Sequence, residues 1–180
     1  MDRFAFHESR YLNSHIDYEE YKTSGRRYIK TWLDPGNKLR IYDYVRENGI
    51  YNFNDGNVHH IRLELTDTYG NASVLQFNVK SIYRKVDSQK EEYSAWLEYD
   101  RSNRFREDEI RLEIPEGALY KDFPFSYVLK PGGEEFYSGI HWVHNNKIPL
   151  HESAALKIKV NGLPDHLEPR ALLVNIDPRT

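Results

Sequence analysis

The sequence contains no cysteine. This excludes structural disulfides, thiol nucleophiles and zinc sites built from cysteine, although it does not fix the compartment. No segment approaches the roughly 18 consecutive apolar residues of a membrane-spanning helix, so we expect no membrane span. The opening stretch "MDRFAFHESR" also lacks the apolar run of a secretion signal. We therefore expect this chain to carry no signal peptide of its own.

The chain also lacks a large excess of charge of either sign. The formal net charge is −3, and basic and acidic residues are mixed along the chain. Proteins that bind nucleic acid present a basic stripe or patch to the phosphate backbone. We therefore expect no nucleic-acid partner.

The short motifs of common catalytic sites are absent too. The sequence has no His-Glu-x-x-His, His-x-His or Gly-x-Ser-x-Gly motif and no phosphate-binding loop. His141 and His144 lie three residues apart in "HWVH", and His59 and His60 are adjacent. In a strand, odd offsets point two side chains to opposite faces, so neither pair is expected to hold a metal ion. We predict no catalytic residue, no metal site and no cofactor in this chain, which is then not an enzyme by itself.

What the sequence does contain is alternation with a period of two. Apolar residues alternate with polar ones in "HIRLELTD" and again in "VLQFNVK", which is typical of two strands with one apolar face. The polar stretch "DTYGN" between them has Asp67, Gly70 and Asn71, which favour turns for local reasons. We predict a β-hairpin here, with "DTYGN" as its turn rather than a ligand site.

Similar short apolar stretches recur along the rest of the chain. Strands are predicted at residues 27–33, 49–53, 109–115, 123–129, 137–144, 155–160 and 171–176. Pro35 and Gly36 suit a type II turn after the first of these, and Gly117 is predicted to lie in another turn. Residues 12–22 are predicted to form a helical turn or an ordered loop. Because no long helical pattern occurs, the sequence predicts an all-β fold of two tandem β-sandwich modules, residues 1–84 and 85–180.

The three tryptophans, Trp32, Trp96 and Trp142, leave two interpretations open. Tryptophan in a small sandwich most often packs in the core. Alternatively, the three rings are exposed and form a platform that stacks on sugar rings. Burial of all three side chains would count heavily against the second interpretation.

An ordered series of segments resembles a known family. "DRFAFHESRYLNSHIDYEEY", "WLDPGNKLRIYDYVRENGIYNF" and "LELTDTYGNASVLQFNVK", followed by "IPEGALYKDFPFSY" and "IPLHESAALKIKV", are similar to the region downstream of the catalytic domain in lysostaphin-type zinc metallopeptidases of Bacteroidetes. Those peptidoglycan endopeptidases carry C-terminal immunoglobulin-like modules. The resemblance implies a chain without the catalytic domain, with the first module lacking its opening strands and the second its closing strands.

The resemblance also implies a role and a location. We expect a non-catalytic β-sandwich accessory region in the cell envelope, periplasmic or at the outer surface. It would position a peptidase domain of the parent protein or contact peptidoglycan. The alternative is a stand-alone carbohydrate-binding β-sandwich that uses exposed aromatic residues to bind a glycan.

Overall fold

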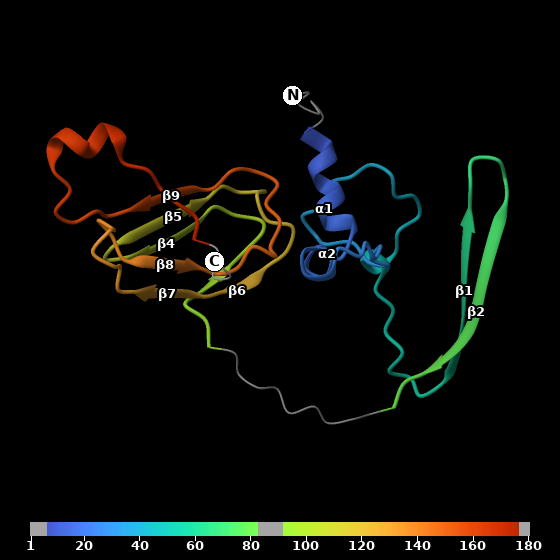
Figure 1. The fold of residues 1–180 in the computed structure, drawn as a ribbon. Coiled ribbons are helices and arrows are strands. Elements are labelled where there is room, and N and C mark those ends of the chain that lie inside the picture. Colours follow the sequence, from blue (N-terminus) through green and yellow to red (C-terminus); the bar gives the residue numbers. More distant parts are fainter. Residues whose placement is uncertain (1–6, 83–91, 177–180) are drawn as a thin grey trace. The chain divides into compact units, whose positions relative to one another are not determined.

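A computed structural model describes residues 7–82 and 92–176 (Figure 1). Of these, residues 7–43 and 92–176 belong to one compact unit, and residues 44–82 belong to another. Strands make up most of the regular structure and the helices are short, so the predicted all-β class is confirmed. None of the helices in the two described ranges has the length and apolar character needed to cross a membrane.

The larger unit contains two sets of strands. In the first set, β4 (Asn103–Glu107), β5 (Ile110–Ile114) and β9 (Ala155–Ile158) form a three-stranded antiparallel sheet. These strands lie side by side in Figure 1. In the second set, β3 (Ala95–Leu97) pairs with β6 (Phe123–Phe125), and β7 (Tyr127–Lys130) pairs with β8 (Ile140–Val143).

A single residue, Ser126, joins the two strand pairs of the second set. The N–H of Ser94 donates to the carbonyl oxygen of Phe125 at 2.7 Å, and the N–H of His144 donates to the carbonyl oxygen of Ser126 at 2.8 Å. Successive carbonyls of an extended strand point to opposite sides. It follows that β3 and β8 flank the 123–130 segment on opposite sides.

The core lies between these two layers. In β5, Ile110, Leu112 and Ile114 are buried while Arg111 and Glu113 are exposed, as the alternation predicts. The ring of Phe105 on β4 meets the ring of Phe125 on β6 edge to face, with centroids 4.9 Å apart. The buried apolar cluster consists of Leu97, Phe105, Ile110, Leu112, Ile114, Ala118, Leu119, Phe123 and Phe125. Since both layers contribute one face to this cluster, residues 92–176 form a β-sandwich.

The N-terminal part of the larger unit is helical. It contains η1 (His7–Tyr11), α1 (Leu12–His15) and α2 (Tyr18–Ser24). The predicted helical turn at residues 12–22 is thus confirmed. The side chain of Asp17 accepts from the N–H of Glu20 at 3.0 Å and caps the start of α2. Gly25, with φ of 76°, ends it.

This helical segment packs on the sandwich. The ring of Tyr11 stacks on that of His151 with centroids 3.9 Å apart. The hydroxyl of Tyr120 donates to the carbonyl oxygen of Arg10 at 2.7 Å, and Arg10 Nη1 donates to the carbonyl oxygen of His151 at 2.7 Å. Burial raises the pKa of the Tyr120 phenol, which stays protonated and keeps its donor role.

Residues 7–43 therefore belong with the C-terminal half of the chain. The predicted boundary between residues 84 and 85 falls in residues 83–91, outside the described residues. The division into modules 1–84 and 85–180 stays a prediction, and so does the immunoglobulin-like topology.

The smaller unit is built around a hairpin. β1 (Val58–Thr66) pairs with β2 (Ala72–Lys80) in an antiparallel register that places Leu63 opposite Leu75. The predicted hairpin is confirmed. This pair is not buried, because Leu63 and Leu75 keep 45% and 58% of their surface exposed. Within residues 44–82, the ring of Phe53 packs against His59 at one end of the face that carries this pair, with centroids 4.7 Å apart.

Three predicted strands are not strands. In residues 27–33 only Ile29 forms an isolated bridge, to Ile16. The stretch at 49–53 follows η2 (Glu47–Gly49), where positive φ at Glu47 and Asn48 turns the chain out of an extended conformation. Residues 171–176 follow η3 (Asp165–Arg170) and pair with no strand of the described chain. Conversely, β3 and β4 were not predicted.

Candidate functional site

His144 follows β8 with a φ of 51°, so the strand geometry that predicted opposite faces for His141 and His144 does not hold for it. The hydroxyl oxygen of Tyr127 lies 2.9 Å from Nδ1 of His141 on β8, whereas His144 packs its ring against Phe123 and Phe125. Burial lowers the pKa of both imidazoles. In the described part of the chain, no group of three His, Asp or Glu side chains could hold a metal ion.

The histidines of the hairpin also have separate partners. His59 Nε2 pairs with Asp55 Oδ1 at 2.8 Å, and His60 Nδ1 lies 3.0 Å from Asn78 Oδ1. Each ring is thus engaged by a neighbour in sequence or across the hairpin.

Two of the three tryptophans lie on the outer face of the second layer. Trp96 on β3 is 52% exposed and Trp142 on β8 is 42% exposed. In the strand register Trp96 is opposite Pro124 and Trp142 is opposite Val128. Positions 124 and 128 point outward together, because Phe123, Phe125 and Tyr127 between them point toward the core. The interpretation that all three tryptophans pack in the core is wrong.

Further side chains extend this aromatic outer face, which we define as Tyr93, Trp96, Val128, Lys130 and Trp142. The ring of Tyr93 lies 5.9 Å from that of Trp96, and Lys130 Nζ lies 4.6 Å from the centre of the Trp142 ring. Trp96 and Trp142 lie on either side of the 123–130 segment, two strand spacings of about 4.8 Å apart, and their partners in the register, residues 124 and 128, are four residues of about 3.3 Å apart along it. The two tryptophan positions are therefore about 16 Å apart. A ligand that contacts both indoles must therefore be extended.

Trp32 is placed elsewhere. It lies in the helical segment, 44% exposed, with Lys30 Nζ 5.8 Å from its ring centre. Lys30 in turn donates to Asp34 Oδ2 at 2.6 Å, and Asp34 is itself buried against Ser14. This corner borders a cleft of about 190 Å³ between the segment and the sandwich. The structure thus brings Trp96 and Trp142 to one face and leaves Trp32 outside it.

The predicted turn residues act locally. The carboxylate of Asp67 accepts from the N–H groups of Tyr69 and Asn71, both at 2.9 Å, and from the amide of Asn71 at 2.7 Å. Gly70 supplies the positive φ of 84° that this turn requires. "DTYGN" is therefore a turn held together by its own side chains. Gly117 lies in a turn as well, with φ of 76°.

The turn at Pro35 and Gly36 differs from the prediction in type. It is closed by the N–H of Asn37 donating to the carbonyl oxygen of Asp34 at 2.9 Å. A type II turn needs a positive φ at Gly36, and the backbone does not have one there. Glycine is required at this position because the sandwich backbone approaches it: a Cβ would lie 2.6 Å from the carbonyl oxygen of Leu119.

Comparison with known protein families found one domain. Residues 94–180 match the Zu5-like domain family. The match covers the β-sandwich and leaves the helical segment that packs on it outside. Comparisons with curated proteins and with solved structures found no match.

Sequence reasoning missed Tyr93, Val128 and Lys130 as members of the aromatic outer face. The alternation in "FPFSYVL" already separates Pro124 and Val128 from the core residues. The strand register, which sets these positions beside the tryptophans, is the part that the sequence pattern does not contain.

Proposed function

We propose that this chain is a non-catalytic β-sandwich region that positions a catalytic domain of its parent protein on an extended cell-wall polymer. The aromatic outer face is the observation that carries this proposal. Two indoles and a valine are exposed on one sheet face, and apolar residues gathered on one face often mark a binding surface. The polymer and the envelope location follow the resemblance to lysostaphin-type zinc peptidases, for which peptidoglycan is the substrate.

The shape of the face suits a long ligand rather than a small one. Flat indole rings stack on other flat or weakly polar rings, and the side chains around them add one cation, Lys130. Two rings about 16 Å apart along one sheet, by strand geometry, are too far apart to sandwich a single sugar ring. A glycan strand several rings long can lie across both.

A sedimentation assay with insoluble peptidoglycan tests this function. The intact chain should co-sediment with peptidoglycan. Trp96→Ala and Trp142→Ala should each weaken binding about tenfold, the equivalent of about 1.4 kcal/mol of stacking energy. Trp32→Ala is the matched control, because Trp32 is equally exposed but lies off this face. If all three variants bind like the wild type, the aromatic outer face is not the binding surface and the proposal is wrong.

Two further experiments test the positioning role. The DNA flanking the coding region should encode a zinc peptidase domain with a His-x-His motif, in the same frame or shifted from it. The isolated chain should not cleave peptidoglycan when zinc is added. Zinc-dependent cleavage by this chain, with the activity retained through purification, would refute a non-catalytic role.

A stand-alone carbohydrate-binding module is the second candidate, and the exposure of Trp96 and Trp142 favours it as well. Binding to soluble oligosaccharides or to insoluble glycans other than peptidoglycan, with the same dependence on Trp96 and Trp142, distinguishes it. Flanking DNA without any peptidase domain would point the same way.

A further inference from the structure

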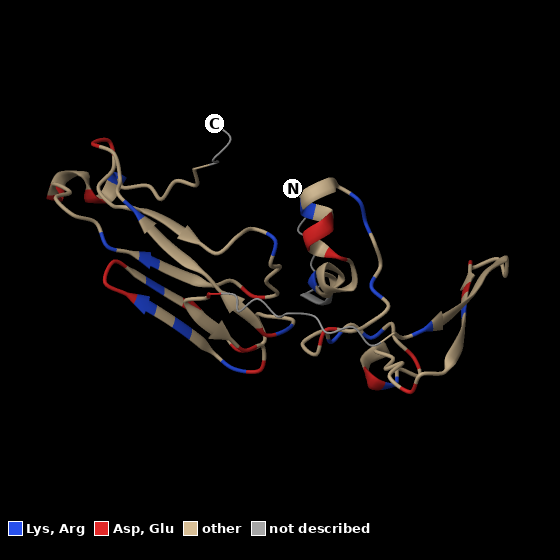
Figure 2. Ribbon diagram, turned by 90° about the horizontal axis from the view of Figure 1, so that it is seen from below, with Lys and Arg blue, Asp and Glu red and all other residues tan. Residues whose placement is uncertain are grey.

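Three positively charged side chains form a row across the other layer of the sandwich. Arg106 on β4 is directly opposite Arg111 on β5, and Arg111 is directly opposite Lys157 on β9. All three residues are exposed, while their strand neighbours Phe105 and Ile110 are buried. The row thus lies on the outer face of the β4–β5–β9 sheet, away from the aromatic outer face. Figure 2 shows Lys and Arg residues as blue bands on several strands of the sandwich.

Such a row is unfavourable for the fold by itself. Like charges directly opposite each other on neighbouring strands destabilise a sheet, whereas opposite charges stabilise it. The same sheet has the favourable arrangement one step away, where Arg104 is opposite Glu113. Within residues 7–82 and 92–176, no acidic side chain forms an ion pair with Arg106, Arg111 or Lys157. The three charges of the row therefore have no ion-pair partner among the described residues.

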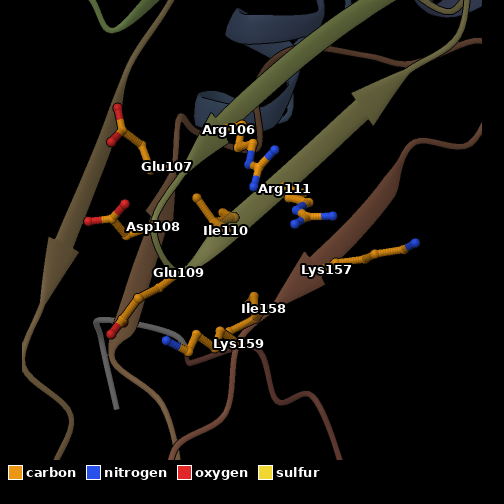
Figure 3. A pocket seen from close by; sticks show the side chains of 9 residues that line it. All are labelled: Arg106, Glu107, Asp108, Glu109, Ile110, Arg111, Lys157, Ile158 and Lys159. Carbon is orange, nitrogen blue, oxygen red and sulfur yellow. The ribbon is translucent and has the colours of Figure 1, made fainter.

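The acidic residues at the β4–β5 turn point away from the three basic side chains. The three basic residues line a cleft of about 500 Å³, and Glu107, Asp108 and Glu109 line it as well. Figure 3 shows their carboxylates on one side of the view, and the guanidinium groups of Arg106 and Arg111 and the amine of Lys157 on the other. Glu107 is paired with Ile110 in the register and so belongs to the inner side of the sheet. Glu109 accepts from the side-chain amide of Asn161 at 3.4 Å and lines a second cleft together with Leu129 and Lys130 of β7, in the opposite layer.

We propose that this cationic row binds a phosphate group. Two guanidinium groups offer planar pairs of N–H donors that match the oxygens of a phosphate, and a lysine adds a third positive charge. Side chains directly opposite on neighbouring strands are about 5 Å apart, so all three can reach one tetrahedral dianion. The phosphate is a free ion or the phosphate ester of a lipid headgroup. This site is independent of the proposed function, because it uses the other layer of the sandwich.

A titration of the full chain with inorganic phosphate tests the site. Amide resonances of β4, β5 and β9 should shift together and saturate at constant ionic strength. Arg111→Gln removes the centre of the row and should weaken binding at least about tenfold. Arg104→Gln is the matched control, with the same charge change on the same sheet face outside the row, and it should leave the affinity within about twofold of the wild type.

Stability separates a binding role from a structural one. Without phosphate, Arg111→Gln should be at least as stable as the wild type, because it relieves repulsion between like charges. With phosphate, the unfolding temperature of the wild type should rise and that of the variant should not. A variant that is less stable without phosphate, with an unchanged phosphate response, would show that Arg111 supports the fold and would overturn the proposal.

The source of the phosphate is resolved by a second arm. Vesicles of phosphatidylcholine with phosphatidic acid are compared with phosphatidylcholine alone. If the chain binds vesicles that contain phosphatidic acid but the titration with free phosphate does not saturate, the site is assigned to a lipid headgroup. If the titration with free phosphate saturates, the site is assigned to the free ion. If neither binds, or if acetate at matched ionic strength gives the same shifts as phosphate, the proposal is wrong. Peptidoglycan binding through the tryptophans is unaffected by either result.

Discussion

Replacing Gly36 with alanine should loosen the helical segment from the sandwich. A Cβ at this position would lie 2.6 Å from the carbonyl oxygen of Leu119 and 2.9 Å from the Cα of Tyr120. Both atoms belong to the backbone, so neither can rotate away as the tip of a long side chain could. The chain around Gly36 must therefore move away from Tyr120.

Two losses contribute to the expected effect. Adding a methyl group to a closely packed site costs about 1–3 kcal/mol. The N–H of Gly36 also donates to the carbonyl oxygen of Tyr120 at 2.7 Å, and this hydrogen bond is lost when the backbone moves. Its net contribution is about 0.5–1.5 kcal/mol, which brings the sum to about 1.5–4.5 kcal/mol. That is a large part of the roughly 5–15 kcal/mol by which a typical domain is stable.

Urea unfolding followed by tryptophan fluorescence measures this loss. Gly36→Ala should unfold at a lower urea concentration with a similar slope. Lys38→Ala is the control two residues away, exposed to solvent, and should stay within about 0.5 kcal/mol of the wild type. If Gly36→Ala unfolds at the wild-type midpoint, the close approach of residues 36 and 120 does not contribute to stability and this reasoning fails.

Three other perturbations follow from the structure. Phe125→Ala removes a ring that is 2% exposed and should lower the thermal unfolding midpoint by the equivalent of about 3–5 kcal/mol, whereas Val128→Ala on the outer face should change it little. Hydrogen bonds from the side chain and backbone of Asn71 hold the pKa of Asp67 below its ordinary 3.8. The ionised carboxylate should therefore stabilise the hairpin turn above pH 3.8, and this stabilisation should be lost as the pH falls through the folded pKa. Hydrogen exchange of the Gly70 amide measures the stability of the turn, and Asp67→Ala should abolish its pH dependence. Burial lowers the pKa of His144, whose Nδ1 accepts from the N–H of Ser126 at 3.3 Å, so the free energy of unfolding should fall as the pH drops below the ordinary 6.5 toward the folded pKa. Between about pH 7 and 5, the free energy of unfolding of His144→Asn should therefore depend less steeply on pH than that of the wild type. An unchanged pH dependence would mean that His144 does not titrate with unfolding.

The elements that were predictable from sequence are those set by local pattern. The hairpin at β1 and β2 combines alternating apolar residues with turn residues that bond to one another, and both signals lie within 25 residues of sequence. β5 to β9 were likewise indicated by alternation between turn signals. β4 was missed because its apolar content is one residue, Phe105, between charged neighbours.

The helical segment was the least predictable part, because its conformation depends on distant partners. Residues 27–33 are rich in aromatic and β-branched residues, which favour strands where a partner strand is available. Here the N–H of Lys30 donates to the carbonyl oxygen of His15 and the N–H of Asp17 to that of Tyr28, so the stretch packs beside helices instead. Neither contact leaves a periodic pattern in the sequence.

The two candidate surfaces show the same division. Alternation in "RFRE", "IRLEI" and "ALKI" places arginines and lysine on one face of each strand. That Arg106, Arg111 and Lys157 fall in one line depends on the register, which the two-residue turn between β4 and β5 sets for the first pair. Exposure of Trp96 and Trp142 depends on the same kind of non-local information.

The contacts of Arg10 with the sandwich also constrain how the protein is made. Its carbonyl oxygen is bound by a residue 110 positions later and its guanidinium by one 141 positions later. At roughly 5–20 residues per second, a ribosome needs about 7–28 s to add 141 residues. During that time Tyr11, which is 8% exposed in the finished fold, has no sandwich to cover it and is open to a chaperone. The helical segment, synthesised before the strands of the sandwich, therefore cannot take its final place until residues 120 and 151 have been made.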